Sequence, residues 1–175
     1  NYVGIYRSNL LMEKMDQITM AEEKKARMIG ECKFLRAYYH FELVRFFENI
    51  PLLTATIKGP SEYNQDQETP KEVYDQIALD LVEAAAVLPT TIPADEAGRI
   101  SKWAAESLLG RVYLFYNGVY GAELQAGELV VDRAKALEYL EDVIANSGHD
   151  LFPDYSTNFK LAGENGIESV FEISH

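Results

Sequence analysis

The chain has 175 residues, of which 47% are hydrophobic and 11% aromatic, and its 28 acidic and 16 basic residues give a formal net charge of −12. This composition excludes a disordered tail and suffices for one domain with a sizeable core. No apolar run approaches the roughly 18 to 20 residues that a membrane-spanning helix needs. The negative charge repels phosphate backbones, so we exclude nucleic acid as a partner.

The first predicted element is a helix over residues 2–15. Tyr2, Ile5, Tyr6 and Asn9 share one of its faces at three- and four-residue spacing. Asn9 is the polar exception on this face. Because an unpaired amide in a core costs about 1 to 3 kcal/mol, we expect Asn9 either to be hydrogen-bonded internally or to be exposed for a ligand.

The second predicted helix is long and runs from about residue 20 to residue 48. Thr19 and Glu22 have the spacing of a capping box at its start, and no proline interrupts it before Pro51. Its apolar residues form two stripes on nearly opposite faces: Leu35, Tyr39, Leu43 and Phe46 on one, and Phe34, Ala37, Phe41 and Val44 on the other. Such a helix must be covered on both sides, which predicts the middle layer of a helical stack.

A third helix is predicted over residues 70–88, after a loop over residues 54–69 that is rich in turn-forming residues. Thr69 and Glu72 have the spacing of a second capping box, and Pro70 stands at the first helical position. Loops of this length without their own structure are commonly functional.

A fourth helix is predicted over residues 101–117, with Ser101 as N-cap and Asn117 and Gly118 closing it. Gly110 lies inside this helix. Because glycine is costly there, we expect a neighbouring backbone to approach closely at this point.

The rest of the chain is predicted to hold a loop over residues 119–131, a helix over residues 132–146 capped by Asp132, and a short strand over residues 169–173. The helices form two pairs: 20–48 with 70–88, and 101–117 with 132–146. We therefore predict an all-α fold of tetratricopeptide-like helix pairs, stacked in layers and separated by long loops.

No pattern indicates catalysis, a metal site or a cofactor. His40, His149 and His175 are scattered, and neither GxSxG nor HExxH occurs. The sequence leaves open a glycosidase-type pair of carboxylates, because any acidic chain offers such pairs once folded. The single cysteine, Cys32, has no disulfide partner in the chain and is predicted to be a buried, inert thiol.

The stretch GECKFLRAYYHFELVRFF followed by ENIPLL, residues 30–53, resembles the signature of the SusD/RagB family of Bacteroidetes outer-membrane proteins. Cys32 stands where alanine is usual, and Glu48 and Asn49 stand where glycine and aspartate are usual. Three further blocks agree in order: TPKEVYDQIALDLVEAAAVLP, GRISKWAAESLLGRVYLF, and RAKALEYLEDVIANSGHDLFPDYSTNF with ESVFEIS. The resemblance covers nearly the whole chain.

The resemblance implies a non-enzymatic lipoprotein, exposed on the outer membrane, that binds an oligosaccharide or polysaccharide and delivers it to a SusC-like TonB-dependent transporter. Residues 1–175 would be one helical domain of a longer protein, associated with the membrane only through a lipid anchor outside this chain. The alternative is a tetratricopeptide-type scaffold that binds other proteins.

Sugar recognition needs flat aromatic faces and polar groups that bind hydroxyls. Tyr6 and Asn9 lie in a block that resembles the family's Y-x-x-I-x-x-A-N stretch near its ligand surface, and Tyr63, Tyr116 and Tyr120 lie in or beside loops. These five residues are the predicted carbohydrate site. The aromatic residues on helix stripes are assigned to the core: Tyr38, Tyr39, Phe46, Phe47, Tyr74 and Tyr113.

Overall fold

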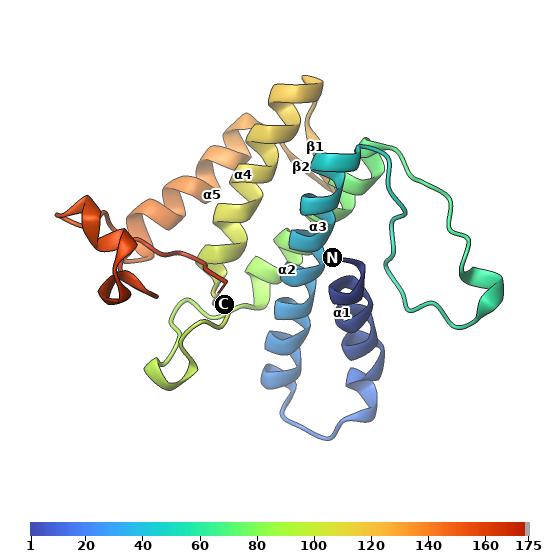
Figure 1. The fold of residues 1–175 in the computed structure, drawn as a ribbon, viewed down its shortest axis with the longest axis horizontal. Coiled ribbons are helices and arrows are strands. Elements are labelled where there is room, and N and C mark those ends of the chain that lie inside the picture. Colours follow the sequence, from blue (N-terminus) through green and yellow to red (C-terminus); the bar gives the residue numbers. More distant parts are fainter. Residues whose placement is uncertain (174–175) are drawn as a thin grey trace.

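The computed structural model describes residues 1–173, which form a layered array of α-helices with one small hairpin (Figure 1). The helices are α1 (Tyr2–Lys14), α2 (Glu22–Phe47), α3 (Pro70–Val87), α4 (Lys102–Tyr120) and α5 (Arg133–Asn146). The hairpin consists of β1 (Leu124–Ala126) and β2 (Leu129–Val131), and the remaining segments carry short 3-10 turns.

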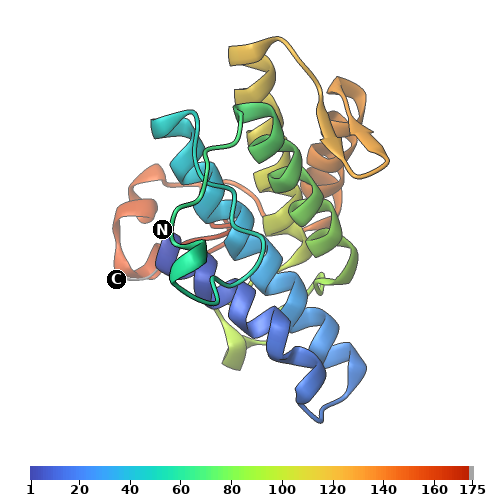
Figure 2. The same ribbon diagram turned by 90° about the vertical axis from the view of Figure 1, so that its right-hand side faces the viewer.

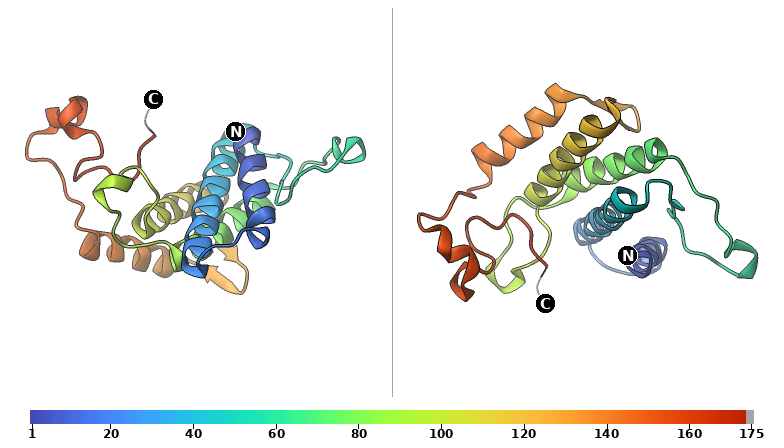
Figure 3. Two further views of the ribbon diagram at one scale, coloured as in Figure 1. Left: turned by 90° about the horizontal axis from the view of Figure 1, so that it is seen from below. Right: turned by 45° about the horizontal axis from the view of Figure 1, so that its top comes forward.

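Each helix packs chiefly against its neighbours in the sequence: α1 on α2, α2 on α3, α3 on α4, and α4 on α5. The two views of Figure 3 show this order as successive layers. The predicted all-α, tetratricopeptide-like fold with both helix pairs is confirmed. The long loop over residues 54–69 and the segment after α5 lie at opposite ends of the long axis of the molecule (Figure 1).

Helix α2 is the middle layer, as its two stripes predict. The stripe of Phe34, Ala37, Phe41 and Val44 is fully buried. The other stripe is covered less evenly, because Leu43 is buried while Phe46 is 74% exposed. The assignment of Phe46 and Phe47 to the core was wrong, since both lie in the last turn of α2, which no element of the described part of the chain covers.

Three of the four predicted N-caps are confirmed. Thr69 forms a complete capping box with Glu72, and Ser101 and Asp132 each accept a hydrogen bond from a backbone amide three residues ahead. The predicted cap at Thr19 was wrong. Helix α2 begins two residues later, after Ala21. The negative charges of Glu22 and Glu23 in its first turn interact favourably with the positive end of the helix dipole.

The region after α4 differs from the prediction. Helix α4 continues past Asn117 to Tyr120 and ends at Gly121, which takes the left-handed conformation with φ 63°. The predicted loop contains the hairpin, in which Leu124 pairs with Val131 and Ala126 with Leu129 around a two-residue turn. Gly127 supplies the positive φ of 62° that this turn needs.

The predicted strand over residues 169–173 was wrong, because these residues pair with no strand in the described part of the chain. Phe171 instead packs its ring against Phe34 at a centroid distance of 4.9 Å and against Tyr38 at 6.0 Å. The segment is therefore anchored by an aromatic side chain. Cys32 is buried as predicted, and burial raises the pKa of its thiol to about 11.

Candidate functional site

A groove lies between α1 and the extended segment 51–57 that follows α2. Its volume is about 240 Å³. The groove is lined by Tyr2, Val3, Tyr6, Asn9, Leu53, Ala55 and Ile57. Tyr6 keeps 44% of its surface exposed, and we call this hollow the Tyr6 groove. Figure 2 shows α1 beside the loop that begins at this groove and continues to the start of α3.

The segment that forms the wall of the Tyr6 groove is held by side chains from α1 and α2. The Tyr2 hydroxyl donates to the Pro51 carbonyl at 3.2 Å. At the other end of the wall, the carboxylate of Glu13 accepts from both the backbone amide and the hydroxyl of Thr56 at 2.7 Å. This extended segment, which has no partner strand among residues 1–173, is thus fixed at both ends.

Asn9 holds the middle of the same wall. Its amide nitrogen donates to the carbonyls of Leu53 and Ala55, both at 3.0 Å, and its oxygen accepts from Nη1 of Arg36 at 2.8 Å. Asn9 is only 1% exposed. Of the two alternatives open from the sequence, internal hydrogen bonding is therefore the one that the structure adopts, and Asn9 positions the wall of the groove.

Arg36 is the centre of this buried network. Its guanidinium donates to Asp80 through Nε at 2.8 Å and Nη2 at 2.6 Å, and to the Thr54 carbonyl at 2.9 Å. Gln76 also donates to Asp80, at 3.0 Å. Burial raises the pKa of Asp80, while the hydrogen bonds and positive charge of Arg36 oppose that rise. Arg36 thus connects α1, α2 and α3 to the groove wall.

His40 completes the network from α2. Its Nε2 accepts from the Leu53 amide at 3.4 Å. Burial, together with the positive charge of Arg36, lowers the pKa of His40 to about 4. A neutral imidazole is required for this contact, because a protonated Nε2 has no lone pair with which to accept a hydrogen bond.

Tyr63 lies in the loop that continues from the Tyr6 groove. It follows the 3-10 turn Pro60–Glu62 and is 67% exposed. Asn64 and Gln67 beside it are exposed as well. The loop therefore presents an aromatic ring and carboxamide groups, the two side-chain types that sugar recognition uses.

Tyr116 and Tyr120 lie elsewhere, in the last turns of α4. Their rings stand 5.0 Å apart, and Tyr116 packs on Tyr74 of α3 at 4.8 Å. Tyr116 is only 3% exposed, whereas Tyr120 is 38% exposed. Tyr116 is therefore a core residue, and the structure does not bring these two tyrosines into the Tyr6 groove.

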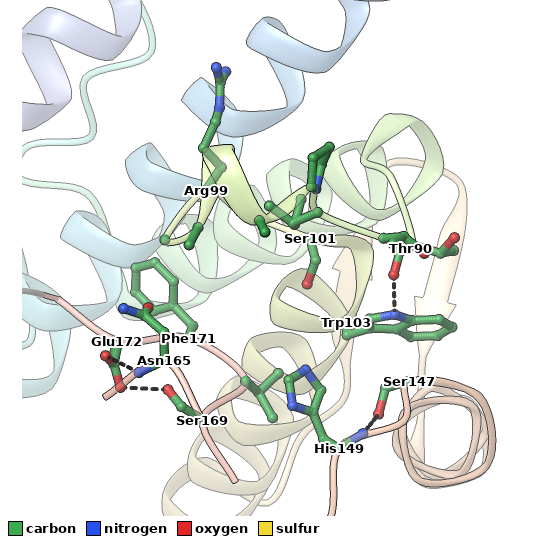
Figure 4. Close-up of a pocket in the computed structure, with 17 residues that line it drawn as sticks. Thr90, Arg99, Ser101, Trp103, Ser147, His149, Asn165, Ser169, Phe171 and Glu172 are labelled. Carbon is green, nitrogen blue, oxygen red and sulfur yellow. Dashed lines mark hydrogen bonds between the residues drawn. The ribbon is translucent and has the colours of Figure 1, made fainter. Parts of the chain in front are cut away.

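A second cavity, larger than the Tyr6 groove, was not predicted from the sequence. It encloses about 490 Å³ between the loop before α4 and the segment after α5 (Figure 4). Trp103, the single tryptophan of the chain, lies in its wall. The sequence shows that this tryptophan is unique, but the cavity forms only when residues 90–103 meet residues 147–172, which are distant in the sequence.

Among residues 1–173, no group of three or more His, Cys, Asp and Glu side chains is arranged to hold a metal ion. Over the same residues, none of the helices combines the length and the apolar character required to cross a bilayer.

Comparison with known proteins shows the family. Residues 1–114 match the model of a SusD-like family described as starch-binding and associating with the outer membrane. A SusD-like protein of Bacteroides ovatus is 29% identical over 163 residues, which are 93% of this chain and 29% of that protein. The chain spans between 29% and 33% of the length of the curated relatives that it matches.

Solved structures agree over almost the whole chain. A laminarin-binding SusD-like protein superposes with a TM-score of 0.87 at 34% identity, covering 99% of this chain and 36% of that one. Surface glycan-binding protein A from Bacteroides thetaiotaomicron, in complex with laminarihexaose, superposes with a TM-score of 0.79 at 25% identity and covers 97% and 33%. The family model, the relatives and the shared fold lead to one conclusion: this chain belongs to the SusD-like family.

Proposed function

We propose that the protein containing this chain binds an oligosaccharide at the outer surface of the outer membrane, without cleaving it, and delivers it to a SusC-like transporter. The observation that carries the proposal is the Tyr6 groove, in which an exposed tyrosine stands on an apolar floor with a rigid wall. Two related proteins support an oligosaccharide as the class of ligand. One is described as laminarin-binding, and the other was solved in complex with laminarihexaose.

The groove suits one face of a sugar ring. The C–H face of a sugar is apolar and packs on an aromatic ring, and Tyr6 offers such a ring at the groove edge. A wall fixed by Asn9, Arg36 and Glu13 loses little conformational freedom on binding, which favours affinity. We propose that the exposed loop with Tyr63, Asn64 and Gln67 supplies further stacking and hydroxyl contacts.

A binding role fits the groove better than hydrolysis. Glycosidases use two carboxyl groups that flank the scissile bond, roughly 5 to 10 Å apart. Within the described residues, no aspartate or glutamate lines the Tyr6 groove. The nearby carboxylate of Glu13 is occupied by Thr56, and that of Asp80 is buried against Arg36.

The test is calorimetry and affinity electrophoresis of the full-length protein against a panel of polysaccharides that includes laminarin and starch. We expect Tyr6→Ala to weaken binding at least tenfold, and Tyr63→Ala to weaken it less. Tyr155→Ala is the matched control, because Tyr155 is 71% exposed in the segment after α5, at the far end of the molecule. Equal binding by the wild type and Tyr6→Ala would remove the groove from the site, and release of a shorter glycan would refute the non-enzymatic role.

Delivery to a transporter is tested separately. The proposal predicts that a TonB-dependent transporter co-purifies with the full-length protein from outer membranes solubilised in mild detergent. Purification of the protein alone, with glycan binding intact, would refute delivery and leave binding standing.

A further inference from the structure

The large cavity shown in Figure 4 shares no residue with the Tyr6 groove. One side is formed by the loop that leads to α4, and the other by the segment that follows α5. Its volume of about 490 Å³ lies within the range of small-molecule sites.

Two aromatic rings stand at opposite sides of this cavity. The indole N–H of Trp103 donates to the Thr90 carbonyl at 2.8 Å, which fixes the orientation of the ring. Phe171 faces it across the cavity and is itself held against Phe34. The cavity therefore has apolar side walls that do not depend on a flexible side chain.

Between these walls, one hydrogen-bond acceptor and one donor face the same space. Nδ1 of His149 lies 3.0 Å from the Ile167 carbonyl, which can only accept, so this contact selects the tautomer with the proton on Nδ1, in which Nε2 is an acceptor. The Ser101 hydroxyl already accepts from the Ala104 amide, and its own proton remains available to donate. Figure 4 shows both groups turned into the cavity.

The charged side chains of the cavity are already paired. Arg99 forms a bidentate contact with Glu31 of α2. The carboxylate of Glu172 accepts from the Asn165 amide at 2.7 Å and from the Ser169 hydroxyl at 2.8 Å. What remains for a ligand is the Ser101 hydroxyl, Nε2 of His149 and the aromatic walls.

From this arrangement we propose that the cavity is a second saccharide-binding site, which takes one or two neutral sugar rings. A sugar hydroxyl both donates and accepts, so a single hydroxyl can donate to Nε2 of His149 while accepting from Ser101. A sugar ring face packs against Phe171, while Trp103, which is 5% exposed and has Lys102 Nζ over its ring at 4.9 Å, closes the opposite wall. This inference rests on the proposed function, because it assumes that the protein binds glycans.

The test exploits the two nitrogens of His149. His149→Asn places an amide where Nδ1 was, keeps the contact with Ile167 and removes the acceptor, whereas His149→Gln keeps an acceptor near the Nε2 position. The two His149 variants are made in the full-length protein, each alone and each combined with Tyr6→Ala. Binding of laminarihexaose and of maltohexaose to each protein is measured by calorimetric titration. We expect two sites in the wild type and one in Tyr6→Ala. In the Tyr6→Ala background, His149→Asn should weaken the affinity of the remaining site about three- to tenfold, and His149→Gln should weaken it less. Neither variant should change the midpoint of thermal unfolding.

The outcomes separate the two proposals. The second site is refuted if the wild type binds at a single site that Tyr6→Ala abolishes. It is also refuted if His149→Asn leaves the affinity of the remaining site unchanged. Either result leaves the proposed function standing. If the wild type binds neither sugar, both proposals fall for these ligands. A remaining site weakened by His149→Asn in a protein of unchanged stability supports the inference.

Discussion

Arg36 and Asp80 form a bidentate ion pair that is almost entirely shielded from solvent: the side chain of Arg36 is 7% exposed and that of Asp80 is 0% exposed. The same guanidinium reaches Asn9 in α1 and the Thr54 carbonyl in the groove wall. A buried ion pair is weak evidence for stability, because desolvation of the two charges offsets much of their attraction. Its four directed hydrogen bonds point instead to a role in fixing the geometry of the Tyr6 groove.

We therefore predict different effects of Arg36 and Asp80 variants on stability and on binding. Arg36→Met or Asp80→Leu alone should cost about 3 to 5 kcal/mol of unfolding free energy, because each leaves one buried charge unpaired. The double variant should be less destabilised than the sum of the two, and yet bind glycan more weakly than wild type. Urea denaturation measures the first quantity and calorimetry the second. Additive losses of stability, or a double variant with full glycan affinity, would contradict the positioning role.

His40 gives a pH-dependent prediction. Its pKa is about 4 in the folded protein and about 6.5 in an unfolded chain, so the unfolded state gains a proton first as the pH falls. The contribution of His40 to stability is complete above pH 6.5 and is lost progressively between pH 6.5 and pH 4. At pH 5 the loss should be about 2 kcal/mol.

The variant His40→Gln isolates this effect. An amide oxygen near the Nε2 position can still accept from the Leu53 amide, but it does not titrate. Between pH 7 and pH 5, the unfolding free energy of His40→Gln should fall by about 2 kcal/mol less than that of the wild type. Parallel pH profiles for the two proteins would show that His40 is not the titrating group.

The sequence predicted most features whose causes are local, although the capping box expected at Thr19 did not form. The caps at Thr69, Ser101 and Asp132 involve a residue and an amide three positions away, and all three formed as expected. No role could be predicted for Arg36, because its partners Thr54, Asn9 and Asp80 lie 18, 27 and 44 residues away in the sequence. Helical spacing also put Tyr6 and Asn9 on one face without distinguishing the exposed residue from the buried one.

The two-sided burial of α2 predicts contrasting effects of one substitution at two phenylalanines. Phe41 is 1% exposed and Phe46 is 74% exposed. Phe41→Asp buries a charge without a partner and should cost several kcal/mol, whereas Phe46→Asp should change the unfolding free energy by less than about 1 kcal/mol. Thermal and urea unfolding check both. Similar losses at the two positions would mean that the last turn of α2 is covered.

Gly110 and Gly118 lie in the same helix and should respond to alanine with opposite signs. A Cβ on Gly110 would stand 2.5 Å from Cδ2 and 2.7 Å from Cγ of Leu140 in α5. The expected close approach is thus made by a side chain and not by a backbone. Among residues 1–173, nothing outside the neighbouring backbone of α4 lies within 4 Å of a Cβ built on Gly118. Gly110→Ala should therefore cost about 1 to 3 kcal/mol through overpacking, while Gly118→Ala should add about 0.5 to 1 kcal/mol of stability through helix propensity.

A double-mutant cycle identifies Leu140 as the cause. Leu140→Ala removes Cγ and both Cδ atoms, so the added methyl group of Gly110→Ala no longer meets them. In that background Gly110→Ala should become neutral or stabilising, with a coupling energy of about 1 to 3 kcal/mol between the two positions. The same penalty for Gly110→Ala with and without Leu140 would place the constraint in the backbone of α4. A vanishing penalty would show that the packing of α4 on α5 is set by the missing side chain at residue 110.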